Sequence, residues 1–166
     1  MTKFSEGLLE YLAVTGSLRA ALNNSGGSPA GCFMYWYSGT EPDSADDAVT
    51  GDILAAFTEG PLPSTTGLTF GATAGVSGNN VTISKTGAES WDAIGTAAAG
   101  AGVAPTFFRI CLESDDGTGA ASSGEIRIQG SIGPAVTEGI VYNGLIVEDS
   151  EYNLASFTIA QPTGES

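Results

Sequence analysis

Carboxylates are the one abundant group in this chain that could do chemistry. The sequence holds nineteen Asp and Glu residues against five Lys and Arg residues, and it contains no histidine. Asp43, Asp46 and Asp47 fall in one polar stretch, and Asp115 and Asp116 fall in another. These stretches could bind calcium, which takes oxygen ligands from flexible loops. The alternative is that they form a solvated acidic surface that keeps the protein soluble. Neither stretch has the spacing of an EF-hand loop, so we expect no bound metal or other cofactor.

Most catalytic arrangements are excluded or unsupported by the residue types. A Ser-His-Asp triad requires a histidine, and the nucleophile pattern Gly-x-Ser-x-Gly is absent from the sequence. The glycine-rich residues 71–78 contain no Gly-Lys-Ser or Gly-Lys-Thr, the sequence that a phosphate-binding loop requires. A glycosidase needs two facing carboxylates, and no motif supports such a pair. We therefore expect that the chain is not an enzyme.

The charge of the chain argues against two classes of partner. The formal net charge is −14, and the sequence pI is about 4.1. Binding to nucleic acid or to an anionic membrane surface depends on clustered basic side chains. The five basic residues are scattered along the chain: Lys3, Arg19, Lys85, Arg109 and Arg127. We expect no nucleic-acid and no membrane partner, and we expect Arg109 and Arg127 to pair with carboxylates.

The two cysteines are expected to be free thiols. Cys32 and Cys111 each lie in an apolar, strand-like run. A buried cysteine behaves as a small hydrophobic residue, so two reduced core thiols are favoured over a disulfide. Residues 1–22 lack the unbroken apolar segment of a secretory signal, and no later run approaches the length of a membrane span.

Aromatic residues offer a second kind of site. Tyr35, Trp36 and Tyr37 are consecutive and could line a carbohydrate platform, with Trp91 as a further candidate. Three consecutive residues of a strand cannot all face one side, however. The alternative interpretation places one face in the core and the other at an edge or a subunit contact, with Trp91 as a packing or interface anchor.

The N-terminus has helical periodicity, and the rest of the chain has the period of strands. Residues 5–14 place an apolar stripe on one face after Ser5, a candidate N-cap, and Ser17 can cap a second short helix. After Cys32 the apolar residues alternate; Phe108 and Ile110, for example, oppose Arg109, and Ile126 and Ile128 oppose Arg127. Further strands are expected at residues 139–147 and 154–160, and residues 52–58 are expected to form a strand or a short helical turn. We predict a mainly β fold: an N-terminal helical segment, residues 1–24, and one antiparallel β-sandwich or jelly-roll-like domain, residues 32–161.

One run carries a resemblance. Residues 37–54 read Tyr-Ser-Gly-Thr-Glu-Pro-Asp-Ser-Ala-Asp-Asp-Ala-Val-Thr-Gly-Asp-Ile-Leu. This run resembles a segment that recurs in small structural proteins of tailed bacteriophages and prophages, where a Tyr-Ser-Gly-Thr-x-Pro-x-Ser-Ala-Asp loop joins two strands. Other stretches resemble that family in the same order: residues 8–22, 67–72, 83–85 with Trp91, 106–109, 127–133 and 156–159. The chain departs from the family pattern in residues 23–30 and in its strong acidity.

The resemblance implies a bacteriophage virion structural protein that acts by protein–protein contacts. The placement that we favour is a capsid decoration or cement protein. A neck or tail adaptor, or a fibre-attachment subunit, is the alternative placement, and a carbohydrate-binding module is the alternative class. The implied partners are the major capsid protein or other virion proteins, with a homo-oligomer, a trimer favoured, assembled in the host cytoplasm into the virion.

The contact residues are expected in the N-terminal helical segment and in the loop of residues 38–51, because binding loops are long, polar and anchored by strands. An alternative is that the helix only closes one end of its own sandwich. The candidate interaction residues are Phe4, Leu8, Tyr11, Leu12, Tyr37, Glu41, Asp43 and Trp91.

Overall fold

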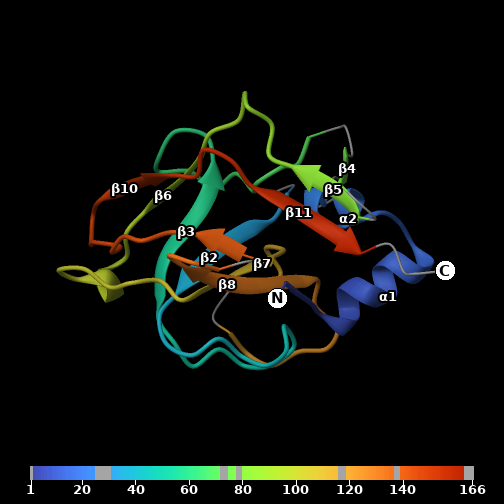
Figure 1. Cartoon of the computed structure of the whole chain (residues 1–166), viewed down its shortest axis with the longest axis horizontal. Helices are drawn as coiled ribbons and strands as arrows, with labels where there is room; N and C mark the ends of the chain where they lie inside the picture. Colours follow the sequence, from blue (N-terminus) through green and yellow to red (C-terminus); the bar gives the residue numbers. More distant parts are fainter. Residues whose placement is uncertain are drawn as a thin grey trace.

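The chain folds into two β-sheets with two short helices at one end, in agreement with the predicted mainly β sandwich (Figure 1). The structure is a computed structural model that describes residues 2–24, 31–71, 75–77, 80–115, 119–136 and 139–162. Helices α1 (Glu6–Val14) and α2 (Leu18–Asn23) lie at the end opposite strands β6 and β10 (Figure 1).

The larger sheet has eight strands in the order β1-β8-β7-β2-β3-β6-β10, with β9 beside β8; the smaller has the order β11-β5-β4. The strands are β1 Lys3–Phe4, β2 Phe33–Tyr37, β3 Ile53–Glu59, β4 Gly75–Ser77, β5 Asn80–Ser84, β6 Trp91–Ile94, β7 Phe107–Cys111, β8 Arg127–Gly133, β9 Gly139–Val141, β10 Glu151–Asn153 and β11 Thr158–Pro162. A 3-10 turn, η1, covers Ala97–Ala99. All these pairs are antiparallel except β8 with β9.

The predicted alternation sets the two faces of the larger sheet. Trp36 lies opposite Phe108, and Phe108 lies opposite Gly130, on the face that points into the sandwich. A Cβ atom on Gly130 would lie 2.8 Å from the Phe108 ring, so the glycine makes room for that ring. Tyr35 lies opposite Arg109 on the other face. We call these the inner face and the outer face.

The core is one cluster that both sheets and both helices share. Phe157, just before β11, meets the Phe108 ring edge-on at 5.6 Å and lies 6.1 Å from the Trp91 ring. Leu8 of α1 and Leu22 of α2 are fully buried in the same cluster. The N-terminal segment therefore contributes to the core that the strands form, rather than to a separate one.

Helix caps form where the sequence predicts them. The Ser5 hydroxyl accepts a hydrogen bond from the Leu8 amide at 3.2 Å and donates one to the Glu125 carbonyl at 2.7 Å. Ser17 caps α2 in the same way, through the Ala20 amide. None of the helices in the described residues is long and apolar enough to span a membrane.

Two short strands were not predicted, and two predicted strands are shorter than expected. β1 and β10 have two and three residues, too few to show a period, and tertiary pairing with β8 and β6 defines them. The expected strand 139–147 ends at Val141, and the expected strand 154–160 begins only at Thr158. Asp52 to Thr58, which could have been a helical turn, belongs to β3.

Candidate functional site

The N-terminal stripe is used mainly inside the molecule. Leu8 has no exposed surface, and Phe4, Tyr11 and Leu12 pack partly buried against the core. Leu8 is therefore a core residue in this conformation, whereas Phe4, Tyr11 and Leu12 keep part of their surface exposed, so contact of these three with a partner stays a prediction. The exposed apolar side chains of α1 lie elsewhere, at Leu9 and Val14.

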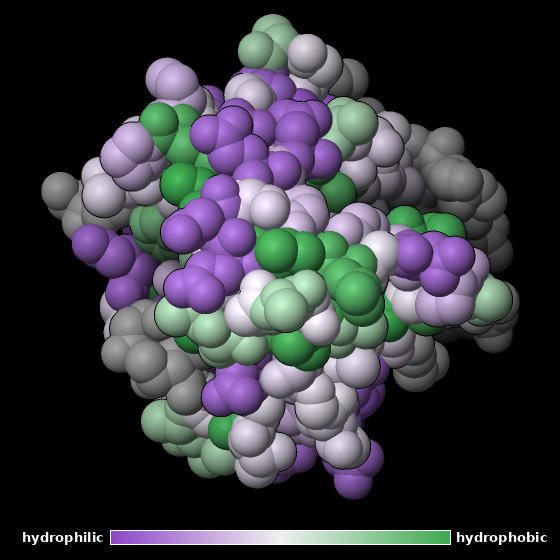
Figure 2. Space-filling view, turned by 90° about the vertical axis from the view of Figure 1, so that its left-hand side faces the viewer, coloured by the Kyte–Doolittle hydropathy of each residue, from purple (hydrophilic) through white to green (hydrophobic). Residues whose placement is uncertain are grey.

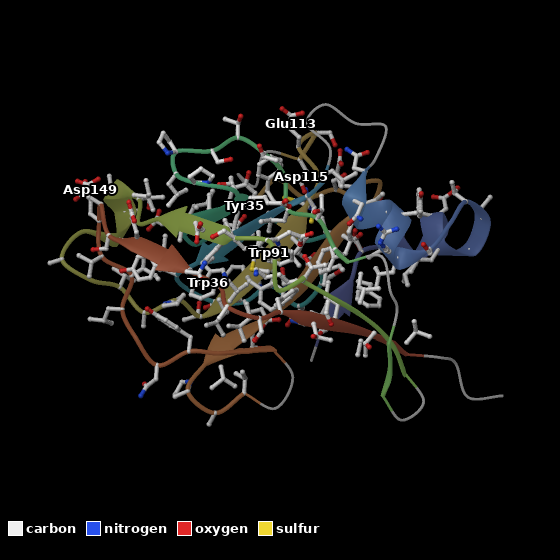
Figure 3. All side chains as sticks on the ribbon, turned by 90° about the horizontal axis from the view of Figure 1, so that it is seen from above. Tyr35, Trp36, Trp91, Glu113, Asp115 and Asp149 are labelled. Atoms are coloured by element: carbon white, nitrogen blue, oxygen red, sulfur yellow. The ribbon has the colours of Figure 1, made fainter. Side chains whose placement is uncertain are left out.

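Three aromatic candidates are core residues as well. Trp91 is fully buried and meets the Phe70 ring edge-on at 5.2 Å. Tyr37 is 1% exposed and stacks on Phe107 at 4.9 Å, and burial raises its pKa. Trp36 lies on the inner face, and Tyr35 lies half-buried on the outer face (Figure 3). In this conformation neither tryptophan is part of an exposed carbohydrate platform, and Tyr37 and Trp91 have almost no exposed surface.

The loop of residues 38–51, here called the signature loop, covers part of the outer face of its own sheet. Three fully buried side chains of β7 and β8 hold its backbone. Arg109 donates to the Asp47 carbonyl at 3.0 Å, and Gln129 donates to the Pro42 carbonyl at 2.8 Å. Arg127 reaches the Ala45 carbonyl at 3.5 Å. The loop is thus built into the fold, which the sequence did not indicate.

The ends of the signature loop are tied to the N-terminal strand. Glu41 forms an ion pair with Lys3 at 2.9 Å and accepts a hydrogen bond from Ser131 at 2.6 Å. Burial raises the pKa of Glu41, but the hydrogen bonds from Ser131 and Lys3 outweigh that effect and lower it. Glu41 is therefore largely occupied within the chain, whereas Asp43 is exposed.

The acidic residues do not gather into a metal site in the described part of the chain. The Asp46 carboxylate accepts hydrogen bonds from the Glu6 amide at 3.0 and 3.3 Å, and Asp47 accepts one from the Ser44 amide. No group of three potential metal ligands occurs among the described residues. Asp116, the second acidic residue of the other stretch, lies outside them.

Of the two strand arginines, one has the expected partner. Arg127 and Asp115 form an ion pair with side chains only 2% and 6% exposed. Burial lowers the pKa of Arg127, but the Asp115 carboxylate outweighs burial and raises it. Arg109 was expected to pair likewise, but it forms no ion pair among the described residues; its acceptors are neutral oxygens of Gln129 and Asp47. Burial and the nearby Arg127 charge lower the pKa of Arg109.

A groove of about 530 Å³ lies on the inner side of the larger sheet. One wall is the strand β9 with Tyr142, and the other is the run of residues 152–158. Buried Trp36 and Phe57 line it as well, and their rings are 4.8 Å apart. We call this the aromatic groove. Its volume is in the range of ligand sites in proteins.

Two tyrosines close one end of the aromatic groove. The hydroxyls of Tyr142 and Tyr152 both donate to the Leu145 carbonyl at 3.3 Å. The Tyr152 hydroxyl also accepts a hydrogen bond from the Val147 amide at 2.8 Å. Tyr142 meets Trp36 edge-on at 5.2 Å, and partial burial, with Tyr152 nearby, raises the pKa of Tyr142. The two tyrosines are held in place without a ligand.

Exposed apolar side chains accompany the aromatic groove. Val141, 69% exposed, lines it; Leu145, 55% exposed, carries the carbonyl that both tyrosines contact. Ile94, also exposed, lies opposite Glu151 of β10 and therefore points to the other side of the sheet, away from the groove. Figure 2, which faces the end of the molecule with β6 and β10, shows hydrophobic side chains grouped between hydrophilic ones. Such a patch on a soluble chain is typical of a contact surface.

The positive charges of the chain are used internally. All five basic side chains form a hydrogen bond or an ion pair within the described residues. The acceptors are Glu41 and Pro42 for Lys3, Phe70 and Gly71 for Arg19, Thr86 and Glu89 for Lys85, Asp47 and Gln129 for Arg109, and Asp115 and Ala120 for Arg127. The exposed charged surface is therefore predominantly acidic.

Sequence reasoning missed Tyr142 and Tyr152. The signal that could have found them is a repeated dipeptide: each tyrosine precedes an asparagine, in Val-Tyr-Asn-Gly and in Glu-Tyr-Asn. Tyrosine combines an apolar ring with a polar hydroxyl, so it suits positions with one buried and one exposed side. Both cysteines are free, buried thiols, and burial raises the pKa of each.

Comparisons of the chain with family models, with curated proteins and with solved structures found no match.

Proposed function

We propose that the chain is a structural protein of a tailed-bacteriophage virion, and that its role is capsid decoration or cementing. The observation that carries the proposal is how the separate stretches of the resemblance lie in space. Thr106 donates to the Gly39 carbonyl at 2.7 Å, at the start of the signature loop. Arg109, Arg127 and Gln129, from two further stretches, bind the same loop. Stretches that are weak one by one thus form one hydrogen-bonded unit.

The exposed acidic and apolar side chains support a role in binding another protein. The exposed acidic residues are Glu6, Glu10, Asp43, Asp47, Asp52, Glu113, Glu148, Asp149 and Glu151. Apolar side chains are exposed between them, near the aromatic groove. A surface of this kind complements a partner with basic and apolar residues, as a virion protein could provide. The alternative placement, in the neck or tail, rests on the same surface.

The carbohydrate-binding alternative keeps one supporting observation. The residues that suggested it are mostly buried, but the aromatic groove has two half-buried tyrosines in its walls, beside Asn153. Aromatic and amide groups together are common in sites for neutral sugars. A sugar-binding protein would bind an oligosaccharide as an isolated chain, whereas a cement protein would bind assembled particles and ignore sugars.

The test is the composition of purified particles. Particles from the genome that encodes the chain are purified on a density gradient, treated with a high-salt wash, and quantified by mass spectrometry against the major capsid protein. We expect the chain to remain with the particles, at a copy number divisible by three. In solution we expect a homo-oligomer, with a trimer at three times the 16.7 kDa chain mass favoured. A chain found only in the unassembled fraction would contradict the proposal.

A further inference from the structure

The aromatic groove is bordered by two open strand edges. Among the described residues β9 pairs only with β8, and β10 pairs only with β6. The wall opposite β9 continues from β10 through residues 154–157, which belong to no strand. In Figure 1, β9 and this run lie on the same side of β2 and β3. An open strand edge offers backbone donors and acceptors to another extended chain.

The two sides of β10 differ in chemistry. Tyr152 lies opposite the buried Ala93, so it points to the inner side, toward the aromatic groove. Glu151 and Asn153 point to the outer side, where a second hollow of about 470 Å³ is lined by Asp92, Pro61 and Leu62. The two hollows share Tyr152 and Asn153. One side of this edge is aromatic, and the other is acidic.

We propose that the aromatic groove binds an extended segment of another virion protein, which adds a strand beside β9 and β10. Successive side chains of a strand point to opposite sides. The segment therefore alternates apolar residues, which contact the half-buried Tyr142 and Tyr152 of the groove, with Lys or Arg residues, which contact Asp92 and Glu151. This inference rests on the proposed function, since it names the partner at that surface.

The acidic charge beside the groove favours a basic segment of another protein over a second copy of this chain. A second copy would bring its own acidic surface against Glu151, and the chain has a net charge of −14. Its basic side chains are already engaged within each molecule, so they do not offer the missing charge. Acidic residues on an edge strand also protect it from pairing with its own kind, while a basic partner remains compatible.

The experiment is site-specific photocrosslinking in assembled particles. Val141→p-benzoylphenylalanine places the reactive group on the β9 wall, and Leu9→p-benzoylphenylalanine on exposed α1 is the matched control. Crosslinked peptides are identified by mass spectrometry. We expect the Val141 variant to capture one segment of a different virion protein, with alternating apolar and basic residues, and the Leu9 variant not to capture that segment.

Each other outcome has a defined meaning. If the chain is absent from the particles, the proposed function fails and this inference fails with it. If the chain is present but position 141 captures nothing, or captures a second copy, only this inference is overturned. Binding of a neutral glucose hexasaccharide to the isolated chain, seen as NMR shifts at Tyr142 and Tyr152, would overturn it in favour of a sugar.

A charge variant gives an independent readout. Glu151→Lys should lower the occupancy of the chain on particles about tenfold, because it opposes the basic residues of the segment. Asp43→Lys, an exposed change on the signature loop, should leave occupancy within about twofold. Equal occupancy of the two variants would contradict the role of the acidic rim.

Discussion

The outer face of the larger sheet and the aromatic groove on its inner side differ in two respects: how distinctive their sequences are and how open they are to solvent. The outer face has the most distinctive sequence, the signature loop, and that loop is held on the sheet by buried Arg109, Arg127 and Gln129. The aromatic groove has no distinctive motif, yet it is open and bordered by unpaired strand edges. A sequence signature can therefore mark a requirement of the fold, while the contact surface that we propose lies elsewhere, at the open groove.

The physical difference is in how polar groups are satisfied. Under the signature loop, buried charged and amide side chains donate hydrogen bonds to loop carbonyls. Removal of any one of these side chains should therefore lower the free energy of unfolding. Around the aromatic groove, the exposed lining residues are apolar or neutral and polar, such as Val141, Asn153 and Ser156, and none of them is a buried charge. Changes to the first region should therefore affect folding, and changes to the second should affect attachment.

The largest expected effect is on the buried ion pair. Arg127→Met leaves Asp115 charged and buried, so we expect a loss of about 3–5 kcal/mol in the free energy of unfolding, measured in urea. Arg19→Met, which removes hydrogen bonds to two carbonyls at a half-buried site, should cost about 1 kcal/mol. The double change Asp115→Leu with Arg127→Met should recover part of the loss. Equal losses for Arg127→Met and Arg19→Met would contradict the importance of the layer.

Closure of the signature loop depends on a glycine. A Cβ atom on Gly51 would lie 1.8 Å from the Ser38 carbonyl oxygen, where the two ends of the loop meet. We expect Gly51→Ala to cost on the order of 2 kcal/mol, because the backbone must shift. Gly87→Ala is the control: nothing lies within 4 Å of its Cβ position. Thermal unfolding of both variants checks the prediction, and similar melting temperatures would refute it.

The Glu41 interaction should give a smaller effect that depends on pH. The pKa of Glu41 is lowered in the folded chain, so its contribution is present above the unfolded-state pKa and is lost as the pH falls through the folded-state value. We expect Glu41→Gln to lower the free energy of unfolding by about 1 kcal/mol at pH 7. The difference from the original chain should shrink as the pH falls below the unfolded-state pKa of a Glu, about 4.3, and should vanish below the lowered folded-state pKa. A difference that persists there would assign it to packing instead.

The smallest effect on stability is expected at the aromatic groove. Val141→Ser and Leu145→Ser replace exposed side chains, so each should change the free energy of unfolding by no more than about 0.5 kcal/mol. Both should nevertheless reduce the occupancy of the chain on particles. Ile140→Ala, a buried neighbour on β9, should instead cost about 2–4 kcal/mol. Normal occupancy of both serine variants would remove the groove from the account.

The sequence predicted the fold where short-range chemistry decides it. Ser5 and Ser17 were identified as caps from residue type and spacing alone, and the alternation in β7 and β8 assigned their faces correctly. These features depend on neighbours a few residues away. Strands as short as β1 and β10 could not be predicted, because their structure comes from pairing with distant strands.

The candidate site could not be predicted for a related reason. A polar loop that binds buried arginines has the same composition as a solvated loop. The sequence therefore did not indicate that the signature loop packs on its own sheet, and we predicted it as a contact element. That Arg127 pairs with Asp115 while Arg109 takes neutral oxygens depends on three-dimensional distances. The aromatic groove arises from segments more than one hundred residues apart, Trp36 and the tyrosines Tyr142 and Tyr152.

We propose that the signature loop stabilises the fold and that the aromatic groove binds the partner. A reconstruction of the intact particle, at a resolution that shows side chains, tests it most directly. We predict density for this chain on the particle, with the signature loop on its own sheet and the groove filled by an extended segment of another virion protein. A chain attached through α1 or the signature loop, with the groove open to solvent, would contradict the account.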